Sequence, residues 1–183
     1  MPDIVEIIKE QHRQVDELLT RAAEEDADTA ALLQQVAGML LPHSAAEEDF
    51  VYPAIRDAAI EAGEEVADGA TEHHQIEEML RNLLDGDPDD PGYDGTLAAI
   101  TGELRHHVQE EEEELLPILE QRLSDQEREE MGRRFAEATA GGSPEQGHEH
   151  LSRHDLYEKA KEQQIPGRSK MSRDQLAEAL GES

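Results

Sequence analysis

The sequence predicts an all-α protein: an up-down-up-down four-helix bundle over residues 1–140, followed by a small helix–extended–helix appendage. Apolar residues recur at three- and four-residue spacing through long segments, and no window alternates with the period of two that is typical of strands. Short turn-forming stretches separate these segments, which favours antiparallel neighbours. The second half of the bundle also repeats the motifs of the first half.

The composition excludes several classes of protein. The chain has no cysteine, which excludes disulfides, zinc–thiolate sites and iron–sulfur clusters and is compatible with a reducing cytoplasm. No signal peptide and no apolar run of about 20 residues is visible, so we expect a cytoplasmic protein without a membrane partner. The net charge is −29, and residues 1–142 carry 10 basic and 37 acidic side chains, so the bundle should repel nucleic acid.

Each expected helix of the bundle is bounded by a start signal or a breaker. Pro2 and Asp3 provide the start of the first helix. Gly63 is expected to end the second, and the turn-rich loop 85–92 separates the third from the fourth. A capping-box pattern that begins at Ser124 predicts a further short helix. The expected ranges are 3–24, 28–62, 64–84, 94–123 and 124–140.

Two motifs of the first half recur in the second. The sequence HRQVDELL at residue 12 matches HHQIEEML at residue 73, with an offset of 61. The sequence HSAAEE at His43 matches HVQEEE at His107, with an offset of 64. A proline, Pro53 or Pro117, stands ten residues after each of these histidines and is expected to kink its helix. Two related helix pairs about a pseudo-two-fold axis would bring the motifs face to face.

Polar side chains lie on the apolar faces that should form the core. In each of the four helices the aliphatic spacing passes through one histidine, and in the second and fourth a glutamate follows it one turn later on the same face. These six residues are His12, His43, Glu47, His73, His107 and Glu111. Asp16 and Glu77 follow the other two histidines by four residues, but an aliphatic neighbour already occupies each face, so we expect both to be solvated.

A metal centre explains why six polar groups share these buried faces. A single histidine on an apolar face is usually a hydrogen-bonded core residue, but burying unpaired carboxylates costs on the order of several kcal/mol each. No Lys or Arg lies on the same faces. Two metal ions would supply the missing charge, with imidazoles and bridging carboxylates as ligands. The alternative is a metal-free bundle in which these groups form a hydrogen-bond network.

The six residues, in this order, resemble the hemerythrin-like, or HHE cation-binding, domain. The resemblance covers residues 1–140 and includes the proline after each HxxxE motif. It implies a four-helix bundle with a non-haem di-iron site, whose members bind or sense oxygen, respond to iron or nitric oxide, or react with peroxide. By this resemblance Glu47 and Glu111 would be the bridges and the four histidines the terminal ligands.

The sequence departs from the oxygen-carrying hemerythrins of invertebrates at two positions. Those proteins have a second histidine where this chain has Glu77, and an aspartate where it has Glu112. The pattern is more similar to the hemerythrin-like domain of the iron-sensing ubiquitin-ligase subunit, with one HxxxE motif in each half. The larger share of carboxylates favours higher iron oxidation states and argues against reversible oxygen carriage. His74, His106, Glu77 and Glu112 remain alternatives to the expected ligands.

Residues 141–151 are expected to form a linker, and residues 152–183 differ from the bundle. They are typical of two short helices around an extended segment, and they resemble the SAP-like module at the start of the Rho termination factor, a unit often linked to nucleic acids. Arg168, Lys170 and Arg173 would form a basic patch for phosphates. The segment is close to neutral, however, so a protein partner or a stabilising role is favoured over nucleic acid.

The predicted function is that of a non-haem di-iron protein that binds, senses or reacts with O2, peroxide or nitric oxide in the cytoplasm. Its cofactor would be two iron ions with an oxo or hydroxo bridge, and His and Glu also suit manganese and zinc. An enzymatic version would decompose peroxide or act as an oxidase. The alternative is an iron-responsive regulatory or iron-buffering protein that acts through its C-terminal module.

Overall fold

The computed structural model describes residues 3–87 and 90–140, together with residues 159, 163, 165, 179 and 180. All regular structure in these residues is helical, which confirms the all-α prediction for the part of the chain described. The elements are α1 (Ile4–Ala22), α2 (Thr29–Ala46), η1 (Glu47–Val51), α3 (Tyr52–Ala58), η2 (Ile60–Ala62), α4 (Gly63–Asp85), α5 (Tyr93–Glu110), η3 (Glu111–Leu115), α6 (Leu116–Arg122) and α7 (Asp125–Thr139).

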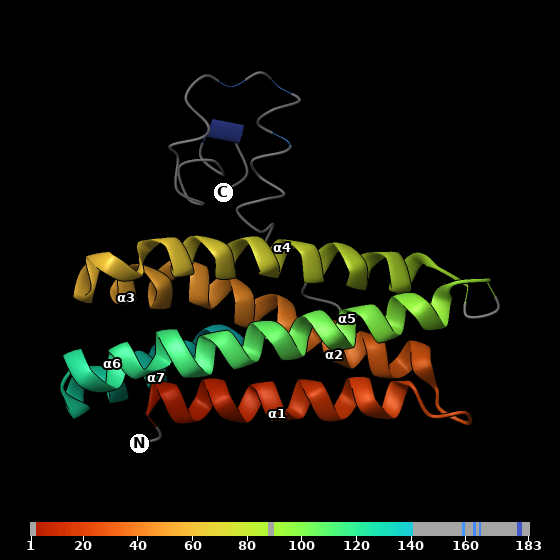
Figure 1. The fold of residues 1–183 in the computed structure, drawn as a ribbon, viewed down its shortest axis with the longest axis horizontal. Coiled ribbons are helices and arrows are strands. Elements are labelled where there is room, and N and C mark those ends of the chain that lie inside the picture. The colour runs from red at the N-terminus through yellow and green to blue at the C-terminus, as the bar shows by residue number, and fades with distance from the viewer. Residues whose placement is uncertain are drawn as a thin grey trace. The chain divides into compact units, whose positions relative to one another are not determined.

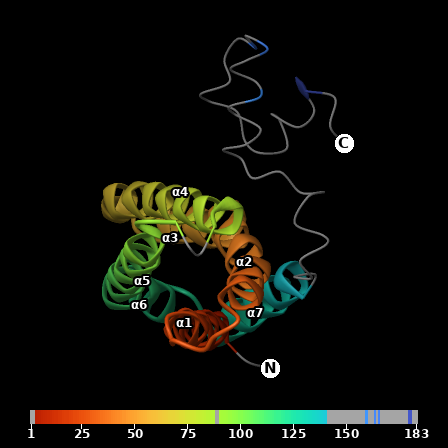
Figure 2. The ribbon, with the colours of Figure 1, turned by 90° about the vertical axis from the view of Figure 1, so that its right-hand side faces the viewer.

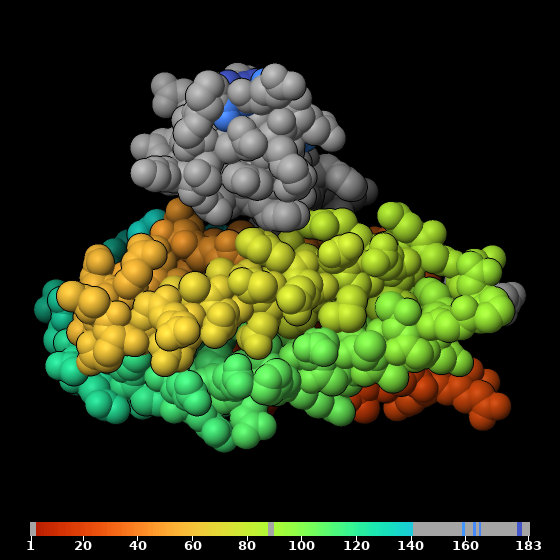
Figure 3. Space-filling view, turned by 45° about the horizontal axis from the view of Figure 1, so that its top comes forward, coloured from red at the N-terminus to blue at the C-terminus, as the bar shows by residue number. Residues whose placement is uncertain are grey.

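The helices form a bundle in which α1, α2, α4 and α5 lie side by side and consecutive members run in opposite directions (Figure 1). Both α1 and α4 pack against α2 and α5. Seen end-on, the four surround one interior, while α7 lies outside them against α1 and α2 (Figure 2). Side chains of α4 and α5 meet along one face and close the bundle on that side (Figure 3).

Local sequence signals set the helix starts. The Asp3 side chain accepts a hydrogen bond from the backbone of the first turn of α1, and the Asp3 backbone N–H donates one to the Glu6 carboxylate. Ser124 and Glu127 form the predicted capping box at the start of α7. Gly92 precedes α5 with a φ of 104°, a left-handed conformation that favours glycine.

The expected second and fourth helices are each interrupted by a five-residue π-helical segment, which begins at Glu47 in one and at Glu111 in the other. The α-helix resumes one residue before Pro53 and one residue before Pro117. Proline has no N–H to donate, so it is tolerated in the first turn of the resumed helix. The break in regular α-helix therefore precedes each proline and begins at the glutamate of each HxxxE motif.

Gly63 was expected to end the second helix, but the structure places it elsewhere. The helix ends at Ala58, Ala59 is extended with φ −146° and ψ 94°, and Gly63 instead begins α4. Ala59 and Ala62 are buried in the core at this corner. The chain turns here because two small side chains fit into the core, and no glycine is needed for that.

The core consists of two apolar clusters with a polar layer between them. Along α1, His12 lies between Ile8 of one cluster and Val15 of the other. The helical segments that carry His43, His73 and His107 repeat this order. In each, residues of one cluster lie before the histidine and residues of the other cluster lie after it. The polar layer is therefore enclosed by aliphatic side chains toward both ends of the bundle.

Contacts divide the chain into a unit Met1–Pro144 and a unit Glu145–Ser183. The predicted linker, residues 141–151, lies outside the described residues, and so does the SAP-like core of the predicted module 152–183, including Arg168, Lys170 and Arg173. Among the helices described, none has an apolar stretch long enough to span a bilayer.

Phe135 anchors α7 to the bundle and generates a stability prediction. It is fully buried, with its ring edge-on to His43 and to Phe50. Phe135→Ala should lower the free energy of unfolding of the metal-free protein by about 3–5 kcal/mol in urea denaturation. Arg133→Ala removes only exposed ion pairs of the same helix and should cost less than about 1 kcal/mol. Equal effects of the two substitutions would contradict this packing.

Candidate metal centre

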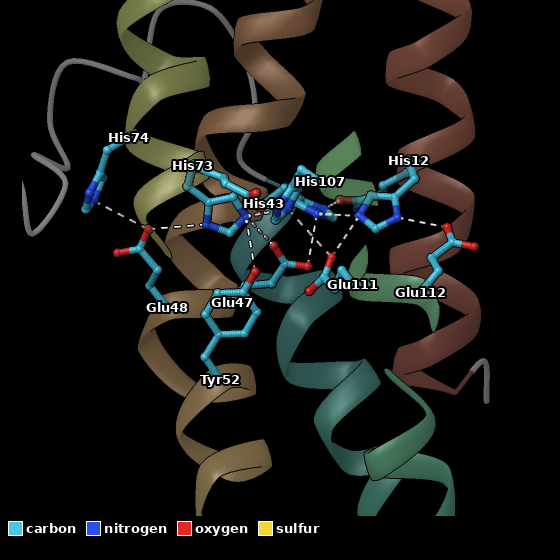
Figure 4. Close-up of polar contacts among 12 residues, drawn as sticks. His12, His43, Glu47, Glu48, Tyr52, His73, His74, His107, Glu111 and Glu112 are labelled. Carbon is cyan, nitrogen blue, oxygen red and sulfur yellow. Dashed lines mark hydrogen bonds and ion pairs between the residues drawn. The ribbon is translucent and has the colours of Figure 1, made fainter. Parts of the chain in front are cut away.

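The six expected ligands meet in the polar layer (Figure 4). Their side chains come from all four long helical segments of the bundle, and none of the six residues is more than 5% exposed. The elements contribute His12 (α1), His43 (α2), Glu47 (η1), His73 (α4), His107 (α5) and Glu111 (η3). The structure thus places each of these residues where the face analysis expected it.

The histidines form two pairs that turn their Nε2 atoms to the centre. The Nε2 atoms of His12 and His43 are 3.2 Å apart, and those of His73 and His107 are 3.0 Å apart. Ligand atoms of the first pair, Glu47 and Glu111 lie within 4.8 Å of one another. Those of the second pair and Glu47 form another such group. The interior therefore offers two neighbouring positions for a metal ion.

The two buried carboxylates each face both histidine pairs. Glu47 places Oε1 3.0 Å from His43 Nε2 and Oε2 3.3 Å from His73 Nε2. Glu111 Oε2 lies 3.3 Å from His12 Nε2 and 3.9 Å from His107 Nε2. Both glutamates are thus arranged to bridge the two positions.

The spacing of these atoms suits shared coordination. Donor atoms bound to one ion at about 2.1 Å lie about 3.0 to 3.4 Å apart when their angles are between a right angle and tetrahedral. The Nε2 pairs at 3.0 and 3.2 Å, and the contacts of Glu47 at 3.0 and 3.3 Å, fall in this interval. The donor set therefore fits metal ions in size as well as in chemistry.

The carboxylate oxygens of Glu47 and Glu111 lack hydrogen-bond partners. All four are inaccessible, and none makes a hydrogen bond within the described residues, although imidazole nitrogens lie 3.0 to 3.3 Å away. Since no Lys or Arg is buried in the part of the chain described, their charge has no internal counter-ion other than the imidazoles. Buried carboxylate oxygens without hydrogen-bond partners beside inward-facing imidazole nitrogens are the signature of a cation site.

Each histidine is held from behind by an oxygen acceptor at its Nδ1. These contacts are His12 to Glu112 at 3.0 Å, His43 to Gln11 at 2.9 Å, His73 to Glu48 at 3.3 Å and His107 to Glu72 at 2.9 Å. Carboxylate and amide oxygens accept, so Nδ1 carries the hydrogen and the Nε2 lone pair faces the centre. This is the tautomer and orientation of a metal-ligating histidine.

The buried glutamates attract positive charge in the absence of a metal. Burial alone lowers the pKa of His12, but the adjacent carboxylates of Glu111 and Glu112 outweigh it and raise that pKa to about 9. Burial alone raises the pKa of Glu47, but the imidazoles that face it, led by His43, hold it well below its usual value. The carboxylate is therefore kept ionised at the centre of an apolar core.

In the second histidine pair, the pKa values of the two histidines shift in opposite directions. Burial lowers the pKa of His73, but the adjacent carboxylates of Glu47 and Glu48 raise it to about 10. Burial raises the pKa of Glu48, yet its hydrogen bonds with histidines, led by His73, lower it to about 2. For His107, burial and the neighbouring charge of His73 lower the pKa. The centre therefore holds protons where metal ions would bind.

None of the four alternative residues belongs to the two central groups. His74 is half-buried and contacts Glu48 at 3.6 Å, whereas His106 is exposed beside Glu110. Glu112 supports His12 from behind. Glu77 was expected to be solvated but is 4% exposed, because it lies one turn after His73 on the same buried face.

Glu77 is paired with Arg81 at 3.2 Å and belongs to neither central group. Burial raises its pKa. Asp16, also expected to be solvated, is partly exposed and forms an ion pair with Arg105. Neither Glu77 nor Asp16 belongs to the two central groups.

Sequence reasoning missed the residues that support the histidines. Gln11 and Glu72 immediately precede His12 and His73, and the repeat pairs them at the offset of 61. Glu48 and Glu112 immediately follow the two bridging glutamates and are paired at the offset of 64. The signal was therefore present in the repeat, since matched positions beside the ligands perform the same task in each half.

These features define a helical bundle with a candidate His/Glu metal centre. The chain belongs to the hemerythrin HHE cation-binding domain family, whose sequence model matches residues 3–119. It is 34% identical over 104 residues to an uncharacterized hemerythrin-like protein of Schizosaccharomyces pombe, a match that covers 56% of this chain and 51% of the relative. The chain thus spans about half the length of this curated relative. No solved structure matches the chain.

The support of His43 by Gln11 generates a prediction of metal affinity. Gln11→Leu removes the acceptor of the His43 Nδ1 hydrogen and should weaken Fe²⁺ binding about 10- to 100-fold, as losses of such partners usually do. Competition with a chelator under anaerobic conditions measures the affinity. Gln14→Leu, on the exposed face of α1, is the matched control and should leave it unchanged. Equal affinities of the two variants would contradict a supporting role for Gln11.

Proposed function

We propose that this protein holds two iron ions in the bundle interior and uses them to bind, sense or react with O2, peroxide or nitric oxide. The observation that carries the proposal is the pair of buried carboxylates, Glu47 and Glu111, each facing histidines of both pairs without a hydrogen-bond partner. A mixed set of imidazoles and carboxylates suits iron, with manganese and zinc as the competing metals.

In this proposal each residue has a defined task. His12 and His43 hold one ion, His73 and His107 hold the other, and Glu47 and Glu111 bridge them. The acceptors behind the histidines fix the tautomer, and the two apolar clusters exclude water from the layer. Iron bound there would supply redox chemistry and an open coordination position for a diatomic ligand or peroxide.

A hollow lies next to the polar layer on the His12 side. It has a volume of about 380 Å³, lies between α1 and α5 and is lined by both His12 and Glu112. Arg105 and Asp16, an ion pair across the same two helices, also line it. In this proposal a small ligand would approach the centre from this side.

Iron reconstitution tests the proposed function. After aerobic loading with Fe²⁺ and removal of excess metal, elemental analysis should give two iron ions per chain, and the absorption spectrum should show oxo-bridged ferric iron. Glu47→Gln and Glu111→Gln should each retain less than half of this iron, because a bridge between the ions loses its charge. Glu110→Gln, exposed and adjacent to Glu111, is the matched control and should retain all of it. Protein that retains no iron, or prefers zinc, would contradict the proposal.

A second candidate function, iron-responsive regulation, is favoured by one contact of α7. Gln11 accepts from His43 Nδ1 and donates from Nε2 to Thr139 Oγ1 at 3.1 Å. Thr139 is the last residue of α7, and the family match ends at residue 119. A change at His43 on iron binding can therefore reach the end of a helix that leads to the C-terminal unit.

Hydrogen exchange tests this second candidate. Iron loading should slow exchange of the α7 backbone amides, because a fixed His43 orders Gln11 and with it Thr139. The slowing should be smaller in Thr139→Val, which keeps the shape of the side chain but removes its hydroxyl. Exchange rates of α7 that do not respond to iron in the wild-type protein would exclude this route of regulation.

A further inference from the structure

The two metal positions differ in how closely the donors gather around them. Ligand atoms of His12, His43 and both glutamates form one close group, and those of His73, His107 and Glu47 form the other. Glu111 approaches the second group with a longer contact, 3.9 Å from His107 Nε2. The six central residues match between the halves of the repeat, so a further donor specific to the second position is to be sought among the neighbours of His73 that do not match.

Tyr52 is the residue at this position that breaks the repeat. At the offset of 64 its counterpart is Leu116, which is aliphatic. Tyr52 is 2% exposed, and its ring stacks on that of His73 with centroids 5.5 Å apart and planes 7° from parallel. Its phenol oxygen lies 3.4 Å from His73 Nε2, and Figure 4 shows it directed toward Glu47 and His73.

The opposite helix leaves room for the phenol. Gly69 is one turn before His73 on α4, and a Cβ at that position would lie 2.9 Å from the Tyr52 oxygen and 3.3 Å from its Cζ. A larger residue at 69 would displace the phenol from the polar layer. The stacking of the Tyr52 ring on His73 and the absence of a side chain at Gly69 together hold the phenol oxygen close to His73.

The hydrogen bonds of His73 show why this oxygen matters to a bound ion. Its Nδ1 hydrogen is donated to Glu48, so the Nε2 lone pair is what the Tyr52 hydroxyl reaches. A metal ion at the second position takes that lone pair. The distance of 3.4 Å then falls within the interval expected for two donor atoms of the same ion.

We propose that Tyr52 is a further metal ligand, whose phenolate oxygen binds the ion held by His73 and His107. This inference rests on the proposed di-iron function. The hydroxyl proton leaves to solvent as the oxygen–metal bond forms, because a metal ion lowers the pKa of its bound groups. Tyr52 supplies the second position with a donor that has no counterpart at the first, where the matching residue is Leu116, so the two ions become chemically inequivalent.

Visible spectroscopy tests this ligand independently of any activity. Phenolate bound to ferric iron has a charge-transfer band, and resonance Raman excitation in that band enhances tyrosinate ring vibrations. The iron-reconstituted wild-type protein should show both signals. Tyr52→Phe, which keeps the ring, should lose both while still binding iron at the first position, and its second iron should be released at least tenfold more readily to a chelator.

The chain contains three tyrosines, which provides matched controls. Tyr93 starts α5, 14 residues and about 21 Å along the helix from His107. The double variant Tyr93→Phe/Tyr157→Phe leaves Tyr52 as the single tyrosine and should keep the band, a result that stands even if Tyr52→Phe does not fold.

The outcomes separate this inference from the proposed function. Two iron ions per chain without a tyrosinate signal would overturn the ligand role, leave the di-iron function intact and indicate a phenol that only donates a hydrogen bond. Persistence of the signal in Tyr52→Phe, or its loss in the double variant, would also overturn it. Wild-type protein that binds no iron would overturn both.

Discussion

Two glutamates buried in an apolar interior are the constraint on which the structure depends. An unpaired carboxylate in such surroundings costs several kcal/mol, on the order of the whole stability of a small domain. No Lys or Arg is buried within the described residues to offset it. The imidazoles that surround Glu47 and Glu111 are the available partners, and they are aimed by acceptors at their rear nitrogens. Bound cations would complete the compensation that the side chains begin.

The backbone is adapted to this constraint as much as the side chains are. Glu47 and Glu111 each begin a π-helical segment, and a proline follows each of them by six residues. The HxxxE motif that leads into each segment is α-helical and so places its histidine and its glutamate one turn apart on the same face, while the missing N–H of proline suits the return to α-helix. The internal repeat then brings a second copy to the opposite side, so one local device produces a centre with two positions.

Much of this arrangement follows from the sequence, because burial and helical periodicity are local signals. Face analysis places His73 rather than His74, and His107 rather than His106, toward the interior, as the structure does. The π turns could not be predicted, since their energies depend on the surrounding fold. The burial of Glu77 was not predicted, because an aliphatic neighbour was taken to fill the buried face of that helix. Residues 141–183 remain a matter of resemblance, since their predicted modules lie largely outside the described residues.

The internal symmetry also shows where the two halves have diverged. Ligands and supporting acceptors keep their positions in both, whereas Tyr52 and the contact from α7 occur on one side each. Anomalous scattering at the iron edge, from crystals of the iron-reconstituted protein, tests the central claim most directly. Two peaks about 3–4 Å apart between Glu47 and Glu111 are the predicted result. An interior without peaks, or iron found instead at the exposed cluster of Glu72, His106 and Glu110, would contradict it.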